Sequence, residues 1–365
     1  MPKKTGLFSL LVAIATLALF LLPGTALARP TSGGGVYQRT NLVSNLPGKA
    51  PITDSNLVNP WGISYSPMGP FWISDNGTGL STLYDGKGNI QPLVVTIPPP
   101  MGGTTSAPTG TVYNSNSKAF VVTENKKSGA SLFLFSTEDG TISGWNPNVD
   151  PTNAILGVDN SKSGAVYKGL AIATNQSGTF LYATNFRAGT VDVFDKNFVL
   201  TKLSGSFTDP NLPKGYAPFG IQAFGSNIVV TYAKQDKAKH DDVPGLGHGF
   251  VDVFDTNGNL VKRLISQGQL DSPWGLAMAP ANFGIFSGDL LVGNFGNGHI
   301  NAYDPNSGML LGTLMNSKGK IIKIDGLWGL MFGNGGQAGQ TNQLFFTSGL
   351  HDEADGLFGM ITQIA

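Results

Sequence analysis

Short apolar runs separated by turn-forming residues recur along most of the chain. The segment Asp271–Leu314 shows the pattern clearly, with runs at Gly275–Ala279, Asp289–Val292, His299–Tyr303 and Leu310–Leu314. At most nine residues separate consecutive runs. These connections are too short for a crossover helix, so neighbouring runs should pair as antiparallel strands. Four such strands in series are typical of one blade of a β-propeller.

The same unit recurs six times, and the first strand of each unit carries a glycine near its start. Those glycines are Gly62, Gly110, Gly169, Gly220, Gly275 and Gly329. Their spacings are 48, 59, 51, 55 and 54 residues. A period near 50 with four strands per unit predicts an all-β, six-bladed propeller of four-stranded antiparallel blades. A two-sheet sandwich with accidental self-similarity is the alternative, and the repeated order of glycine, turn, aspartate and leucine argues against it.

The second unit can be aligned with the others in two ways. We prefer the alignment in which Glu138-Asp139-Gly140-Thr141 matches the turn Asp75-Asn76-Gly77-Thr78 of the first unit. This choice leaves a long first hairpin through Phe120-Val121-Val122. The alternative takes Glu124-Asn125 as the matching turn.

Repeated residue types suggest repeated physical roles. Glycine lets the innermost strands approach closely around the axis. An aromatic residue precedes that glycine in four units and is expected to fill the wedge between blades: Trp61, Phe219, Trp274 and Trp328. An aspartate after the third strand favours a turn in four units: Asp85, Asp195, Asp255 and Asp304.

The two ends of the propeller should meet in the last blade. Only three strands follow Trp328, whereas the strand-like run Val36–Val43 has no partner near it in the sequence. We therefore predict that Val36–Val43 is the fourth strand of that blade and that Tyr37–Leu42 pairs with Met360–Ile364. Such pairing would remove the open edge of the ring.

The N-terminus has the pattern of a secretory signal. A basic start, the apolar run Leu7–Leu22 and a small-x-small site ending at Ala28 predict a signal peptide over residues 1–28. An uncleaved anchor is the alternative, but a predominantly apolar run of 16 residues is short for a bilayer span. We expect a flexible leader over residues 29–35 and one propeller domain over residues 36–365.

Composition restricts the partners. The chain has 23 basic and 23 acidic residues, and loss of Lys3 and Lys4 with the signal would leave 21 against 23. This balance offers no electrostatic footprint for nucleic acid or an anionic membrane. There is no cysteine, so an exported chain must rely on a large core rather than on disulfides. We expect a monomer secreted to the periplasm or the medium.

Four segments carry a resemblance to a known family. They are Asn59–Ile63, Asp75–Gly79, Thr137–Trp145 and His240–Asp255. With them the chain resembles an uncharacterised family of secreted bacterial six-bladed propellers related to the NHL and lactonase-like group. The resemblance implies the fold and export, and it implies no established activity.

Residues with possible chemistry gather in one kind of loop. All four histidines lie between the second and third strands of their blades, and loops of that kind share one face of a propeller. The ligand-binding candidates on this face are Asp75, Glu138, Asp139, Asn185, Asn294 and Asp352. The metal-ligand candidates are His240, Asp241, Asp242, His248, His299 and His351. Oxygen ligands would suit Ca²⁺ and imidazoles would suit Zn²⁺. No local metal motif is present, and each residue taken singly could simply form a turn.

These features leave three hypotheses about function. The first is a secreted propeller that binds a small molecule, a protein or a polysaccharide on the face with the loops between strands two and three. The second is a Ca²⁺- or Zn²⁺-dependent hydrolase, lactonase or lyase with its site at the channel mouth. The third is a structural surface protein. The chain lacks a cysteine nucleophile and a G-x-S-x-G elbow, so catalysis stays an open question.

Overall fold

The computed structural model describes residues 1–2 and 36–364. The predicted leader over residues 29–35 and all but residues 1–2 of the predicted signal peptide lie outside the described residues. Within the described part of the chain, no helix has the length and apolar character needed to cross a membrane.

Six sheets, each with four antiparallel strands in series, form the blades within residues 36–364. Blade 1 contains β3 (Pro60–Tyr65), β4 (Phe71–Asp75), β5 (Leu80–Tyr84) and β6 (Ile90–Thr96). Blade 2 contains β7 (Pro108–Tyr113), β10 (Phe133–Thr137), β11 (Thr141–Trp145) and β12 (Ile155–Asp159). Blade 3 contains β13 (Tyr167–Asn175), β14 (Gly178–Asn185), β15 (Thr190–Phe194) and β16 (Leu200–Thr201).

The remaining blades repeat this plan. Blade 4 contains β17 (Tyr216–Phe224), β18 (Asn227–Lys234), β19 (Phe250–Asp255) and β20 (Leu260–Ser266). Blade 5 contains β21 (Pro273–Met278), β22 (Leu290–Asn294), β23 (Ile300–Tyr303) and β24 (Leu310–Thr313). Blade 6 contains β25 (Leu327–Phe332), β26 (Leu344–Gly349), β27 (Asp355–Ile364) and β1 (Val36–Ser44), with β2 (Ile52–Thr53) beside β1. The short helical turns are η1 (Ser161–Ser163), η2 (Gly284–Phe286) and α1 (Leu350–Glu353).

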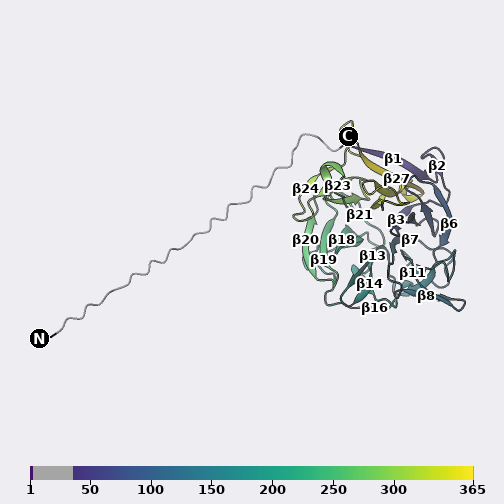
Figure 1. Cartoon of the computed structure of the whole chain (residues 1–365), viewed down its shortest axis with the longest axis horizontal. Coiled ribbons are helices and arrows are strands. Elements are labelled where there is room, and N and C mark those ends of the chain that lie inside the picture. Colours follow the sequence, from purple (N-terminus) through teal and green to yellow (C-terminus); the bar gives the residue numbers. More distant parts are fainter. Residues whose placement is uncertain (3–35, 365) are drawn as a thin grey trace. The chain divides into compact units, whose positions relative to one another are not determined.

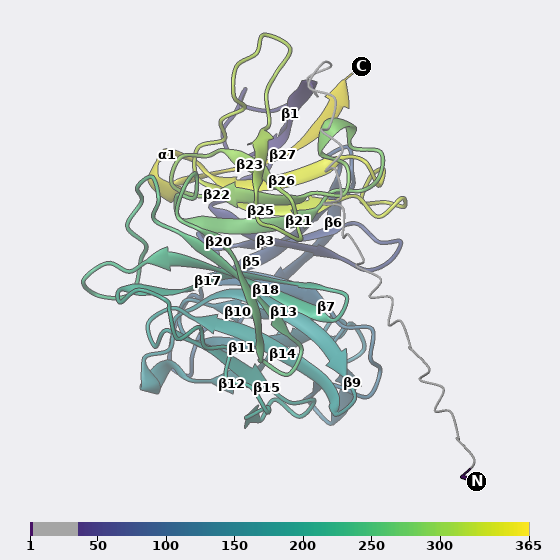
Figure 2. The ribbon, with the colours of Figure 1, turned by 90° about the vertical axis from the view of Figure 1, so that its left-hand side faces the viewer.

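The six sheets form a closed ring, as predicted. The innermost strand of each blade contacts the innermost strands of both neighbouring blades, and β25 contacts β3 (Figure 1). Viewed from the side, α1 lies in the loop between β26 and β27 of the last blade (Figure 2). The fold is therefore an all-β, six-bladed propeller with almost no helix.

The pairing of the two ends of the propeller is confirmed. β1 runs antiparallel to β27, from Val36 opposite Ile364 to Ser44 opposite Leu357. The Tyr37 hydroxyl also donates a 2.9 Å hydrogen bond to the Phe283 carbonyl in blade 5. The first strand thus completes blade 6 and removes the free edge of β27.

The preferred alignment of the second unit is also confirmed. The turn Glu138–Thr141 joins β10 to β11 in the position that Asp75–Thr78 has in blade 1. The inserted residues form a separate hairpin of β8 (Val121–Glu124) and β9 (Lys127–Ala130). The alternative that matched Glu124-Asn125 to this turn is wrong.

The glycine of each innermost strand is needed for close packing, as expected. A Cβ placed on Gly220 would lie 2.1 Å from the carbonyl oxygen of Trp274 in the next blade. A Cβ on Gly62 would lie 2.4 Å from the carbonyl oxygen of Thr109. Non-bonded atoms do not approach so closely, so a side chain here would force adjacent blades apart.

The aromatic residues before those glycines differ from expectation. They do not fill separate wedges between blades. Instead, Trp61, Phe219, Trp274 and Trp328 belong to one buried cluster. The rings of Trp61 and Trp328 stack with centroids 3.5 Å apart, and Trp274 meets both edge-on. The reason is geometric, because the residue before the glycine lies at the axial end of its strand, where the innermost strands converge.

Candidate functional site

A buried lysine stands at the centre of the site. Lys168 is the second residue of the innermost strand of blade 3, and its side chain is 2% exposed. Its ammonium group donates to Glu138 Oε1 and, over 3.2 Å, to Asp241 Oδ1. The same ammonium lies 5.1 Å from the centroid of the Trp61 ring, within the range of a cation–π contact. Lys168 therefore joins blades 1, 2, 3 and 4 at the axis.

The surrounding carboxylates keep this lysine charged. Burial alone lowers the pKa of Lys168, but the charges and hydrogen bonds of Glu138 and Asp241 outweigh burial, so the net shift is upward. The same partnership acts on Asp241. Burial raises the pKa of Asp241, while Lys168 and His240 lower it to a net value below normal. Lys168 and Asp241 are therefore both charged at neutral pH.

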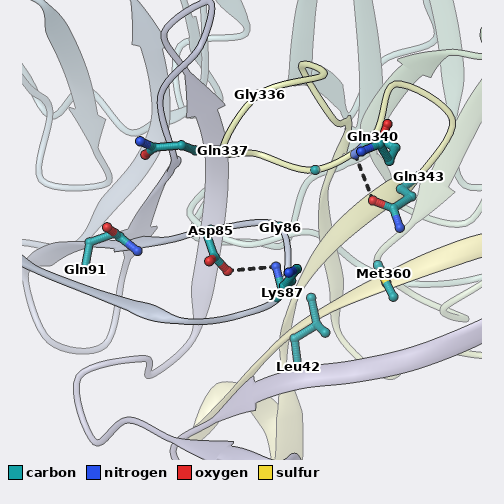
Figure 3. Close-up of a pocket in the computed structure, with 11 residues that line it drawn as sticks. Leu42, Asp85, Gly86, Lys87, Gln91, Gly336, Gln337, Gln340, Gln343 and Met360 are labelled. Atoms are coloured by element: carbon teal, nitrogen blue, oxygen red, sulfur yellow. Dashed lines mark hydrogen bonds between the residues drawn. The ribbon is translucent and has the colours of Figure 1, made fainter.

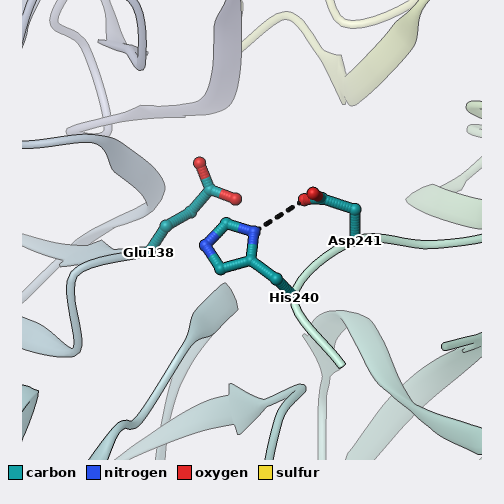
Figure 4. Close-up of side chains that lie close together, drawn as sticks. All are labelled: Glu138, His240 and Asp241. Carbon is teal, nitrogen blue, oxygen red and sulfur yellow. Dashed lines mark hydrogen bonds and ion pairs between the residues drawn. The ribbon is translucent and has the colours of Figure 1, made fainter. Parts of the chain in front are cut away.

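One histidine joins this network. His240 Nδ1 lies 2.9 Å from Asp241 Oδ1, and Asp236 accepts a 2.8 Å hydrogen bond from the His240 backbone N–H. Among the described residues, Glu138, His240 and Asp241 form a group whose potential ligand atoms all lie within 4.8 Å of one another (Figure 4). One imidazole and two carboxylates fit a Zn²⁺-type or Ca²⁺-type donor set in chemistry. Glu138, however, already receives Lys168, so a bound ion would share that carboxylate.

An asparagine links the network to the aromatic cluster. Asn59 donates to Asn76 Oδ1 at 3.2 Å and to Glu353 Oε2 at 2.6 Å. Its own Oδ1 accepts the Trp328 indole N–H at 3.2 Å. Asn76 then donates to Glu138 Oε2 at 2.8 Å. Both Glu138 oxygens are therefore held, and Glu353 is connected to them through two amide side chains.

Two carboxyl groups in this region hold their protons unusually well. Burial raises the pKa of Glu353 to about 7, and the nearby charges of Glu138 and Asp242 add to the effect. Burial raises the pKa of Asp242 to about 6. The Ser272 hydroxyl acts in the opposite direction on Asp242, although neither Asp242 Oδ2 nor that hydroxyl makes a hydrogen bond of standard geometry. Carboxyl groups titrating near neutrality can donate or accept protons under physiological conditions.

A cavity of about 370 Å³ lies beside the network. Its lining residues are Pro244, Phe295, Gly296, Asp325, Gly326, Gly349, His351, Asp352 and Glu353. Three consecutive lining residues, His351, Asp352 and Glu353, have left-handed backbone conformations with φ of 53°, 53° and 68°. Left-handed conformations are unfavourable for residues other than glycine. The turn nevertheless places all three residues in the cavity wall.

The candidates from sequence separate into two groups. The structure brings Glu138, His240 and Asp241 together, with Asp242 close enough for its charge to act on Glu353. It places His351 and Asp352 in the wall of the adjoining cavity.

The other candidates make hydrogen bonds to backbone or side-chain groups near them. Asp75 is fully buried and accepts from the Thr82 N–H and hydroxyl. The remaining contacts are from Ala107 N–H to Asp139, from Asn185 to Asp192, from Asn294 to the Gln269 carbonyl, and between His248 Nδ1 and the Val243 carbonyl. His299 is half-buried, and burial together with Lys323 lowers its pKa.

Sequence reasoning missed the residue at the centre. Lys168 directly precedes Gly169, and in four other units that position is aromatic, as in Trp61-Gly62. A lysine at an otherwise aromatic axial position was a signal that could have been used. Asn59 and Asn76 gave no such signal, because Asn before proline or glycine ordinarily indicates a turn.

The largest of the described cavities lies on the opposite face. It measures about 680 Å³ and lies between the turn that follows β5 and the β25–β26 loop (Figure 3). Its charged lining residues are Asp85 and Lys87, and Asp85 accepts a 2.8 Å hydrogen bond from the Lys87 backbone N–H. Because Asp85 stabilises the turn, and because the smaller cavity beside Lys168 is lined by three carboxylates and a histidine, that smaller cavity is the better candidate site.

Sequence comparison gives relatives in a virus. No known family model matches the chain. The uncharacterized protein R648 of Acanthamoeba polyphaga mimivirus is 35% identical over 327 residues, covering 88% of this chain and 78% of the relative. The uncharacterized protein L690 of the same virus is 34% identical over 344 residues, covering 92% and 88%. This chain belongs to their family. The bacterial origin and the export implied by the earlier resemblance stay predictions.

Comparison with solved structures supports the fold. Virginiamycin B lyase from Staphylococcus aureus is 15% identical with a TM-score of 0.51, covering 90% of this chain and 99% of that one. The soluble aldose sugar dehydrogenase from Escherichia coli is 10% identical with a TM-score of 0.55, covering 90% and 100%. At these identities the likeness shows a shared propeller fold alone.

Proposed function

We propose that this protein binds a small-molecule ligand at the end of the propeller axis that carries the loops between strands two and three. The observation that carries the proposal is convergence. Polar or charged side chains from five blades reach one place above the aromatic cluster: Asn59, Glu138, Lys168, Asp241 and Glu353.

The stability of the ring does not explain why charged side chains converge here. Burying a charged group is unfavourable, and an ion pair at best offsets that cost. An aromatic residue fills the position of Lys168 in four of the other blades, where it packs into the core. Polar groups retained at an axial position with an adjoining cavity are typical of a binding site.

A second candidate is a metal-dependent lyase or hydrolase. It is favoured by the grouping of Glu138, His240 and Asp241 within 4.8 Å. A Ca²⁺ or Zn²⁺ ion held there would supply Lewis-acid polarisation of a substrate carbonyl. Glu138, His240 and Asp241 would hold the ion, and Glu353, with a pKa of about 7, would exchange protons with the substrate. Proteins of the same fold include a lyase and a dehydrogenase.

One experiment separates these functions. The thermal unfolding midpoint of the purified protein would be measured with Ca²⁺, Mn²⁺ or Zn²⁺, in wild type and in His240→Ala. The matched control is His299→Ala, because His299 lies outside the three-residue group. A metal-dependent enzyme predicts a metal-induced rise that His240→Ala loses and His299→Ala keeps, together with turnover of a lactone or ester panel.

The binding proposal has its own test. A panel of neutral, anionic and cationic small molecules would be screened by ligand-observed NMR against wild type and Glu353→Gln. Binding that Glu353→Gln weakens supports the axial site. If neither Glu353→Gln nor His240→Ala weakens the binding of any molecule in the panel, the axial binding site is rejected.

We also propose export of the chain and a monomeric state. The support for export is the N-terminal pattern of residues 1–28, and the support for a monomer is that β1 closes the last blade within one chain. Mass spectrometry of protein from the native host should show Arg29 as the first residue. Light scattering should give the mass of one chain, and a dimer mass or an intact N-terminus would contradict these proposals.

A further inference from the structure

We propose that the cavity lined by Phe295, Asp352 and Glu353 binds an organic ammonium ion, that is, a small molecule carrying a primary or quaternary amine. This inference rests on the proposed ligand-binding function and names the chemical class of its ligand. It concerns the cavity beside the ion-paired network rather than the group of Glu138, His240 and Asp241.

The charges of the cavity favour a cation. Asp325, Asp352 and Glu353 line it, and no lysine or arginine does. The Asp352 side chain makes no hydrogen bond or ion pair with any other described residue. Asp325 pairs at 2.9 Å with Lys323, and both of those side chains are largely exposed. A cationic ligand would therefore bring the positive charge that Asp352 lacks.

An aromatic wall favours an organic cation over a metal ion. The Phe295 ring stacks on the Trp328 ring with centroids 4.0 Å apart and planes 24° apart. Phe295 is only partly buried and lines the cavity. Aromatic faces attract ammonium groups through their quadrupole, and such contacts recognise alkylated amines. The volume of about 370 Å³ also suits a small organic molecule.

The protein already contains this arrangement with its own ammonium group. Lys168 Nζ lies against the Trp61 ring and between the carboxylates of Glu138 and Asp241. The cavity repeats this combination, because Phe295 supplies an aromatic face as Trp61 does and Asp352 supplies a carboxylate as Asp241 does. It contains no lysine to complete the set.

A buried acceptor gives an independent indication. Asp242 Oδ2 is buried and accepts no hydrogen bond of standard geometry. The Asp242 charge raises the pKa of Glu353, so the two carboxyl groups lie near each other, and Pro244, two residues further along, lines the cavity. A buried acceptor without a partner is unfavourable. An N–H donor from an ammonium ligand that reached past the lining residue Pro244 would satisfy it, in place of the imperfect contact with Ser272.

The test uses a charged probe and its neutral counterpart. Binding of n-butylammonium chloride, 1-butanol and CaCl₂ would be measured by titration calorimetry at pH 8 with the full chain. We expect n-butylammonium to bind at least about tenfold more tightly than 1-butanol, because a charge-assisted hydrogen bond is lost with the neutral probe. Asp352→Asn should weaken n-butylammonium binding about tenfold, and Phe295→Leu about fivefold. Glu124→Gln, which removes a partly exposed carboxylate on the β8–β9 hairpin outside the cavity lining, should leave n-butylammonium binding unchanged.

Each contrary result has a defined meaning. Equal binding of n-butylammonium and 1-butanol, or n-butylammonium binding that Asp352→Asn leaves intact, overturns the inference. Binding of CaCl₂ alone, lost in His240→Ala, would also overturn it while supporting the metal-dependent function. A neutral or anionic ligand that Glu353→Gln weakens would overturn the ammonium assignment and leave the axial binding site in place. Circular dichroism of each variant distinguishes loss of binding from loss of the fold.

Discussion

The indole ring of Trp328 lies almost flat on that of Trp61, with the ring centroids 3.5 Å apart and the planes 19° apart. The two residues belong to the last and first blades, which are separated by most of the chain. Trp328 also donates its indole N–H to Asn59, which holds Glu353. One side chain thus joins ring closure to the polar site above it.

Replacement of Trp328 should therefore affect both stability and the site. Trp328→Ala removes a fully buried ring and leaves Asn59 Oδ1 without its donor, so we expect a loss of about 3–5 kcal/mol in the free energy of unfolding. Urea denaturation measures this loss. Leu200→Ala, at a side chain that is 60% exposed, should change stability by less than about 0.5 kcal/mol. A similar small change for Trp328→Ala would contradict the central position of this ring.

Lys168 should be coupled to Glu138. Lys168→Met leaves a half-buried carboxylate without its cation, and such changes cost about 3–5 kcal/mol. Glu138→Gln in the same chain removes the uncompensated charge, so the double variant should be more stable than Lys168→Met alone. A double-mutant cycle by urea denaturation gives the coupling free energy. Additive effects of the two substitutions would show that the pair is not an energetic unit.

Stability should decrease as pH rises from about 4 to about 7. Burial raises the pKa of Asp252 to about 7, aided by Asp209 and opposed by Arg263, and burial raises that of Glu353 to about 7. Since the unfolded carboxyl groups titrate near 3.8 and 4.5, the folded state binds more protons in this window. Raising the pH therefore favours unfolding until the folded pKa values are passed.

The control for this pH effect removes one of the groups. Asp252→Asn should flatten the decrease measured by urea denaturation between pH 4.5 and 7.5, whereas Glu124→Gln should leave its slope unchanged. A free energy of unfolding that instead rises across this interval would show that carboxylates with lowered pKa values dominate.

Gly220 should not tolerate a side chain. Gly220→Ala places a Cβ 2.1 Å from the Trp274 carbonyl oxygen, and overpacking of this kind costs about 1–3 kcal/mol. Gly215→Ala is the comparison, because φ at Gly215 is +86° and no atom lies within 4 Å of the added Cβ. The free energy of unfolding of Gly215→Ala should fall by about 1 kcal/mol, because alanine is unfavourable in this backbone conformation. A lower thermal unfolding midpoint for Gly215→Ala than for Gly220→Ala would contradict the close contact between blades at Gly220.

Much of the fold could be predicted because its information is local and repeated. Apolar runs such as Gly275–Ala279 define strands, and glycine and aspartate define the turns between them. The spacing of Gly62 and its five counterparts then gives the number of blades. The pairing of β1 with β27 followed from a strand without a partner at one end and a three-stranded unit at the other.

The candidate site was harder to predict because it depends on contacts between distant residues. Glu138 and His240 were found because each lies in a loop whose place in the blade is regular. Their meeting with Lys168 was not found, because the sign of it lies only in the comparison of units, where Lys168 stands at a position that is aromatic in four others. The central aromatic cluster was similarly misplaced, because the convergence of strands at the axis has no signature in one blade.

By itself the sequence determined the strand order, the number of blades and the face on which polar loops gather, because periodicity and turn chemistry act over a few residues. Only the tertiary structure decided that Lys168 lies between Glu138 and Asp241, and that the turn His351–Glu353 lines a cavity beside Phe295. Those contacts join residues up to hundreds of positions apart. They exist because closing the ring brings the axial ends of separate blades to one point.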